Sequence, residues 1–184
     1  MEVVDIGDLN AGLVEAKDCE KAYRLAYEYD QKYGACPQCV IAAVQETIGG
    51  ISDDVFKASQ ALSGGGGLAG KGTCGALAGG MMAISAYFGR EKNDFAKKNR
   101  KPYELAKKLY DRFTEKYGGP SCHDVQRTLF GRTFNMWSAE EFRQYLDSGG
   151  HNDKCPAVSG DVAKWTVEII LGEKERVCNV QPHS

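Results

Sequence analysis

The sequence lacks the long hydrophobic runs and the blocks of like charge that identify several large classes of protein. Its longest apolar stretch, residues 76–88, includes two glycines and a serine and is shorter than the roughly 18 residues of a membrane helix. Its 23 basic residues are balanced by 25 acidic ones, and Glu104 interrupts the densest basic segment, 97–108. We therefore expect neither membrane insertion nor binding to nucleic acid.

A secretory leader is also missing from the start of the sequence. Residues 1–8 are acidic and do not show the basic and then apolar order of a signal peptide. A cytoplasmic protein is therefore the expectation. The length of 184 residues suits one domain, and the 42% of hydrophobic residues can supply its core.

The alternation typical of β-strands is absent, whereas apolar residues recur at helical spacing along most of the chain. Ser121 and Asp124 form a capping-box pattern, and Thr73 is placed to cap the helix that follows it. We predict an all-α fold, an irregular bundle of about seven to eight helices in a single domain. The predicted helices span residues 11–33, 37–48, 52–62, 74–88, 101–117, 122–130, 138–146 and 159–171.

Cysteine, by contrast, is abundant. The chain has seven cysteines, an odd number that cannot all pair within one chain. Without a leader that directs the chain to an oxidising compartment, metal binding or thiol redox chemistry is favoured over a disulfide framework. Five cysteines lie at or near helix starts that glycine or proline marks, namely Cys36, Cys39, Cys74, Cys122 and Cys155.

A helix start offers free N–H groups and a partial positive charge, which lower the pKa of a thiol and favour the thiolate. We therefore expect these five cysteines to be reactive or to bind metal. Cys19 lies in the middle of a helix, where a buried structural role is expected. Cys178, near the end of the chain, has no clear assignment.

The segment around Cys74 carries a recognisable motif. Cys74-Gly75-Ala76-Leu77-Ala78-Gly79 follows a glycine-rich loop, residues 63–72, and leads into an apolar helix. This pattern resembles the signature of the C-GCAxxG-C-C family of redox-active proteins, named for an upstream cysteine, this box and two further cysteines. The resemblance covers about residues 20–172 and implies one helical redox domain, with a flexible tail over about 173–184 outside it.

The resemblance also implies a cofactor. The family is related to split-Soret cytochromes, whose equivalent domain is associated with an iron–sulfur centre. By resemblance, the metal ligands are Cys39, Cys74, Cys122 and Cys155. Glycine allows the backbone to approach a cofactor closely, so Gly72 and Gly75 are the expected cofactor-binding positions. The sequence contains no Cys-x-x-Cys-His, so covalent c-type haem is not expected.

Three other interpretations of these features stay open or weak. Cys36 and Cys39 could form a redox dithiol, as in a thiol–disulfide oxidoreductase, although no strand precedes them as in thioredoxin. Four thiolates also suit zinc, which would make the chain a zinc-stabilised, non-redox binding module. The loop 65–71 matches most of a phosphate-binding pattern, but Gly72 stands where serine or threonine should bind magnesium.

The remaining residues indicate little further chemistry. His123 follows Cys122 and could assist a thiolate or bind metal, whereas His151 and His183 lie in a loop and in the tail, without an assigned role. The sequence therefore predicts electron transfer or redox sensing through a cysteine-bound centre. Such a protein requires a redox partner protein, and a homodimer is compatible with this function.

Overall fold

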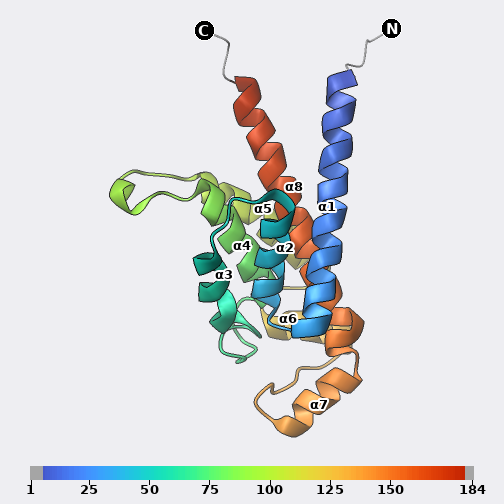
Figure 1. Cartoon of the computed structure of the whole chain (residues 1–184). Helices are drawn as coiled ribbons and strands as arrows, with labels where there is room; N and C mark the ends of the chain where they lie inside the picture. Colours follow the sequence, from blue (N-terminus) through green and yellow to red (C-terminus); the bar gives the residue numbers. More distant parts are fainter. Residues whose placement is uncertain (1–5, 181–184) are drawn as a thin grey trace.

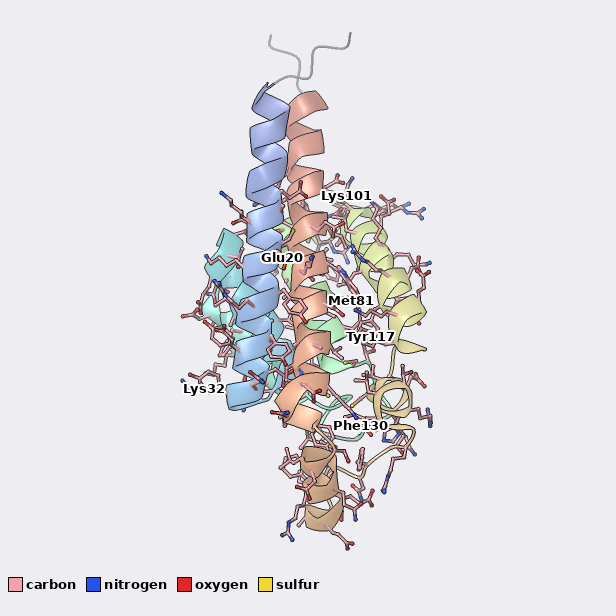
Figure 2. All side chains as sticks on the ribbon, turned by 90° about the vertical axis from the view of Figure 1, so that its right-hand side faces the viewer. Glu20, Lys32, Met81, Lys101, Tyr117 and Phe130 are labelled. Carbon is pink, nitrogen blue, oxygen red and sulfur yellow. The ribbon has the colours of Figure 1, made fainter. Side chains whose placement is uncertain are left out.

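The two longest helices, which lie at opposite ends of the sequence, form the frame of the fold. The structure is a computed structural model that describes residues 6–180, with side chains described for residues 15–174. Helices α1 (Ile6–Tyr33) and α8 (Cys155–Val180) lie side by side, and their outer ends project beyond the other helices (Figures 1 and 2). Glu20 on α1 forms an ion pair with Lys164 on α8, which links the two helices.

Shorter helices fill the space beside this pair, while α7 lies below the rest of the bundle in Figure 1. Helices α2 and α4 contact each other and α8, and α5 contacts both α4 and α8. The core between them includes the fully buried side chains of Val40, Leu77, Leu109 and Ile170. The elements between the two long helices are α2 (Cys36–Ile48), α3 (Asp53–Ser59), the 3-10 turn η1 (Gln60–Leu62), α4 (Gly75–Phe88), the 3-10 turn η2 (Lys92–Asp94), α5 (Lys101–Tyr117), α6 (Cys122–Phe130), α7 (Ala139–Asp147) and the π-helical turn η3 (Gly150–Lys154).

The predicted all-α fold is confirmed by eight α-helices within residues 6–180, where no strand is formed. Helices α5 and α6 have the predicted bounds. Helix α8 begins earlier than predicted, at Cys155, because Pro156 occupies the first turn, where its missing N–H removes no helical hydrogen bond. It continues to Val180, through much of the expected tail, and residues 181–184, with His183, lie outside the described part of the chain.

The two predicted helix caps differ in outcome. At α6 the capping box is present: Ser121 Oγ accepts a hydrogen bond from the Asp124 N–H, and Asp124 Oδ2 accepts one from the Ser121 N–H. The cap predicted at Thr73 is wrong, because Cys74 occupies the N-cap position of α4 and no side chain caps it. Thr73 instead joins Ser121 in an isolated β-bridge.

Glycines allow α4 to pass through the crowded centre of the bundle. A Cβ atom on Gly79 would lie 2.6 Å from the carbonyl oxygen of Pro37, and one on Gly80 would lie 2.7 Å from Leu109 Cδ2. Such distances leave no space for a side chain, so the backbone of α4 lies directly against α2 on one face and α5 on another. The box 74–79 is thereby held beside the start of α2.

No helix within residues 6–180 combines the length and the apolar character that crossing a bilayer requires.

Candidate cysteine site

Four cysteines from distant parts of the sequence line one cavity near the C-terminal end of α1. They are Cys36, Cys74, Cys122 and Cys155, and the cavity that they share has a volume of about 230 Å³. Its other walls are mostly apolar and include side chains of the segment that carries α7. The additional lining side chains are Asp30, Tyr33, Ala35, Ser63, Leu68, Ala76, Val125, Gln126, Met136, Phe142, Tyr145, His151, Val158 and Ser159.

Helix starts bring these four cysteines together. Cys36, Cys122 and Cys155 are the first residues of α2, α6 and α8, and Cys74 directly precedes α4. Their placement at helix starts is therefore confirmed. All four are free thiols, and none of them forms a disulfide.

Cys39 lies outside this cavity. It is one turn inside α2 and lines a second cavity, of about 380 Å³, together with Tyr29, Glu46 and Phe56. Its thiol donates a hydrogen bond to the carbonyl oxygen of Gly34 at 2.8 Å, and it is 3% exposed. Of the two cysteines in the Cys-x-x-Cys segment, the structure thus brings Cys36, and not Cys39, to the other three.

A strained turn separates the two cavities and contributes to the walls of both. Gly34 and Ala35, which connect α1 to α2, have φ values of +63° and +55°. Two consecutive left-handed residues reverse the chain sharply, and for an alanine this conformation costs roughly 1–2 kcal/mol. The turn is the reason that residues only three positions apart can line different spaces.

The glycine-rich loop fixes Cys122 beside Cys74. The Cys122 N–H donates to the carbonyl of Gly72 at 3.1 Å, and the Cys74 N–H donates to the carbonyl of Pro120 at 2.8 Å. Gly72 does not line the cavity; a Cβ there would lie 2.4 Å from the carbonyl oxygen of Gly65, so it serves close packing of the loop on itself. Gly75 has a more direct role, because a Cβ there would lie 2.6 Å from Cys36 Sγ.

The same loop is not arranged as a phosphate cradle. Backbone N–H groups that would have to point at a phosphate donate instead to carbonyl groups of the loop itself and of the 3-10 turn η1 that precedes it. The bonds include Gly66 to Leu62, Gly67 to Ala61, Leu68 to Ser63, Ala69 to Gly66, Gly70 to Gly64 and Gly72 to Gly65. Side-chain packing agrees, because the ring of His123 occupies the position where Gly70 would carry a Cβ.

The thiolate state expected of these cysteines is wrong. Burial raises the pKa of Cys74 to about 12 and that of Cys122 to about 11, and it raises the pKa values of Cys36 and Cys155 well above the ordinary thiol value. The loss of solvation therefore outweighs the helix starts, and the cysteines are neutral thiols at neutral pH.

Hydrogen bonds partly oppose this effect of burial. The N–H groups of Ala76 and Leu77 lower the pKa of Cys74, and the Tyr145 hydroxyl lowers that of Cys155. Gln126 Nε2 lies 3.5 Å from Cys122 Sγ. These donors are placed to stabilise the thiolate forms of the three cysteines.

Sequence reasoning missed three polar residues of this cavity, Asp30, His151 and Ser159. Asp30 is fully buried; its Oδ1 lies 3.0 Å from His151 Nδ1, and its Oδ2 accepts a hydrogen bond from the Ser159 hydroxyl. His151 lies 121 residues from Asp30 in the sequence. No local pattern could have paired them, since only the packing of α1 against η3 and α8 brings them together.

The cysteines do not converge on a single point. Among the described residues, no three His, Cys, Asp or Glu side chains form a group that could hold a metal ion. The four thiols therefore line the cavity without forming a preformed site for a single metal ion.

Comparison with known proteins identifies a family over most of the chain. The model of the family described as "Putative redox-active protein (C_GCAxxG_C_C)" matches residues 34–169, a range that contains all four cavity cysteines and Cys39. Neither the curated proteins nor the solved structures contain a match.

Proposed function

Because this chain belongs to the C_GCAxxG_C_C family of redox-active proteins, we propose that it transfers or senses electrons through an iron–sulfur centre bound by cysteine. The observation that carries the proposal is the meeting of four thiols, from four separate segments, in one largely apolar cavity. The proposed ligands are Cys36, Cys74, Cys122 and Cys155.

The donor set and its surroundings suit such a centre. Thiolates are the soft ligands that iron–sulfur clusters and zinc prefer. The free thiols have raised pKa values, so a bound cation would have to displace their protons, as is usual when metal binding couples to ionisation. The backbone donors at Ala76 and Leu77 and the Tyr145 hydroxyl would then hydrogen-bond to thiolate sulfur, which tunes the reduction potential of a cluster.

A single zinc ion is less suited to this cavity than a cluster is. Zinc requires four ligands at about 2.0–2.3 Å from one point. No described group of three or more ligands meets that condition. A cluster divides its cysteines among several iron atoms, so its ligands can stand farther apart around a larger space. A zinc-stabilised binding module thus remains as an outcome of the metal analysis and not as the favoured function.

A thiol–disulfide oxidoreductase that uses Cys36 and Cys39 has less support. The two sulfurs line different cavities, and the Cys39 thiol donates its hydrogen to the carbonyl of Gly34. A dithiol pair would need both sulfurs in one accessible site. This interpretation becomes the leading one if the protein binds no metal.

Metal analysis of anaerobically purified protein tests the proposal. We expect the wild type to contain iron and acid-labile sulfide, with broad visible absorption that dithionite bleaches. Cys74→Ser should lose this centre, whereas Cys19→Ser, which changes a buried cysteine outside the cavity, should keep it. Protein without metal would refute the proposal, and zinc without a reducible centre would replace it with the binding module.

The cellular setting is part of the same proposal. A reducing cytoplasm would keep the four thiols free for metal, and electrons would reach the centre from a redox partner protein. Fractionation of cells followed by detection of the chain tests the location, and recovery from the membrane or an oxidising compartment would contradict it.

A further inference from the structure

The buried carboxylate of Asp30 is unusual in a cavity whose walls are mostly apolar. Its side chain is fully buried, and both of its oxygens are used: Oδ1 faces His151 Nδ1, and Oδ2 accepts from the Ser159 hydroxyl. Removing a carboxylate from water costs several kcal/mol, which an apolar residue at the same place would not. Asp30 of α1, His151 of η3 and Ser159 of α8 thus form a polar cluster beside a candidate site. Such a cluster indicates a functional role in addition to packing.

The hydrogen bond to Asp30 assigns the tautomer of His151. The carboxylate can only accept, so Nδ1 carries the hydrogen, and Nε2 of the neutral ring is left as an acceptor. The Nε2 edge lies at the turn between the two cavities, 3.5 Å from the position of a Cβ on Gly34. The His151 side chain is 29% exposed, whereas that of Asp30 is 0% exposed. The imidazole is therefore partly open to solvent, whereas the carboxylate is not.

The other titratable groups near His151 are less suited to accept a proton. Tyr145 of α7 meets the imidazole edge-on, with ring centroids 5.3 Å apart, and its hydroxyl donates to Cys155, so it stays a neutral phenol. Within η3, Asp153 Oδ1 lies close to Gly149, and the Lys154 ammonium lies over the Phe130 ring. Cys155 of α8 and Cys36 of α2 line the cavity as proposed ligands.

We propose that Asp30 and His151 couple reduction of the cysteine-bound centre to the uptake of one proton. This inference rests on the proposed function and adds to it. When the redox partner delivers one electron, one proton from solvent would bind to Nε2 of His151. The ring would then be an imidazolium held by the Asp30 carboxylate. The new positive charge offsets the added electron in a cavity of low dielectric constant, and no bond to the centre has to form or break.

The coupling has a definite sign. Protons favour the reduced state, so the midpoint potential should fall as pH rises. For one proton per electron the slope is about 59 mV per pH unit, because a tenfold change in proton concentration then shifts a one-electron equilibrium tenfold. His151 acts here through the positive charge that it gains, and it does not have to contact the centre.

The experiment measures the midpoint potential of the loaded protein between about pH 5 and pH 9, the range in which histidine titrates. We expect the wild type to show a slope approaching 59 mV per pH unit over part of this range. His151→Gln should flatten the slope, while Glu46→Gln, which changes a carboxylate that lines the other cavity, should retain it. Equal iron and sulfide content in all three proteins keeps the comparison valid.

Two readouts on the wild type do not depend on any variant. Proton uptake during reduction, followed with an indicator dye, should approach one proton per electron. The ¹⁵N spectrum of the metal-free protein should show hydrogen on Nδ1 of His151 and none on Nε2 at alkaline pH.

The outcomes separate the two proposals. A loaded centre whose potential does not change with pH, or an Nε2-protonated His151, would overturn the coupling and leave the proposed function intact. A slope that survives in His151→Gln would also overturn it. Protein that takes up no reducible centre would overturn the proposed function, and the coupling with it.

Discussion

Cys36 and Cys39 lie three residues apart in one helix and belong to different environments. The cavity of Cys36 contains three more cysteines and a buried carboxylate, whereas the cavity of Cys39 contains aromatic rings, Glu46 and no other cysteine among its lining residues. The difference follows from position: Cys36 is the first residue of α2, and Cys39 is one turn further along. Cys36 therefore lines the four-cysteine cavity because it stands at the helix start, directly after the Gly34–Ala35 turn.

The strongest test of this comparison replaces each of the two cysteines in turn. We expect Cys36→Ser to lose the metal centre, because it removes one of four cavity thiols, and Cys39→Ser to retain iron and sulfide near the wild-type level. Metal analysis and visible spectra after anaerobic purification provide the measurement. The reverse result would return Cys39 to the ligand set that the family signature implies.

A second test adds one methyl group on the Cys36 side. Gly75→Ala would place a Cβ 2.6 Å from Cys36 Sγ and 2.8 Å from Pro37 Cδ, so α2 or α4 must move. We expect a loss of about 1–3 kcal/mol in the free energy of unfolding, measured in urea, together with reduced iron content.

Gly172→Ala is the matched control for Gly75→Ala. Gly172 lies within α8, and a Cβ there meets nothing within 4 Å. We expect this substitution to stabilise the protein by about 0.5–1 kcal/mol, because alanine loses less backbone entropy than glycine in a helix. Equal losses from the two substitutions would show that the contact between Gly75 and Cys36 has no special weight.

Alkaline pH tests a property that the two cavities share. The ordinary thiol pKa is 9.0, and burial raises that of Cys122 to about 11 and that of Cys39 further still. A raised pKa in the fold means that unfolded thiols ionise first, so their contribution to stability is complete below pH 9.0 and is lost as pH rises toward 11.

We therefore expect the melting temperature of the metal-free protein to fall between pH 9.0 and about 11. Cys122→Ala and Cys39→Ala should each make this fall less steep, because each removes one thiol that ionises more readily when unfolded. Calorimetry on the two variants and the wild type measures the effect. A steeper fall in either variant would contradict the neutral state assigned to that thiol.

The smallest effect concerns the turn that separates the two environments. Ala35 has φ +55°, a conformation that glycine adopts without steric cost. We expect Ala35→Gly to stabilise the protein by about 0.5–1 kcal/mol, the left-handed penalty of alanine less the greater chain entropy of glycine. The same substitution inside α2, Ala42→Gly, should destabilise by a similar amount. Urea unfolding of both variants decides whether the turn is strained.

Much of the fold was predictable because its signals are local. Apolar residues at helical spacing predicted α5, and Ser121 with Asp124 predicted the start of α6. The start of α8 was harder, because Pro156 can end one helix or begin another, and only packing against α1 decides between them.

The site was predictable in part, for the same physical reason. Helix-start positions identified Cys74, Cys122 and Cys155 as candidates that the structure brings together, and applied strictly they would also have favoured Cys36 over Cys39. The ionisation of the thiols could not be read from helix starts, since burial depends on the whole fold. The pair formed by Asp30 and His151 bridges 121 residues and has no local signature.

The pairing of α1 with α8 also determines when the four-cysteine cavity can be complete during synthesis of the chain. Cys155 is the last cavity cysteine to leave the ribosome, and the helix that positions it packs against the first helix of the chain. The sulfur-lined chamber is therefore incomplete throughout most of translation. Metal delivered to the nascent chain would meet at most three of the four cavity cysteines. A centre of the proposed kind would therefore be inserted after synthesis of the chain.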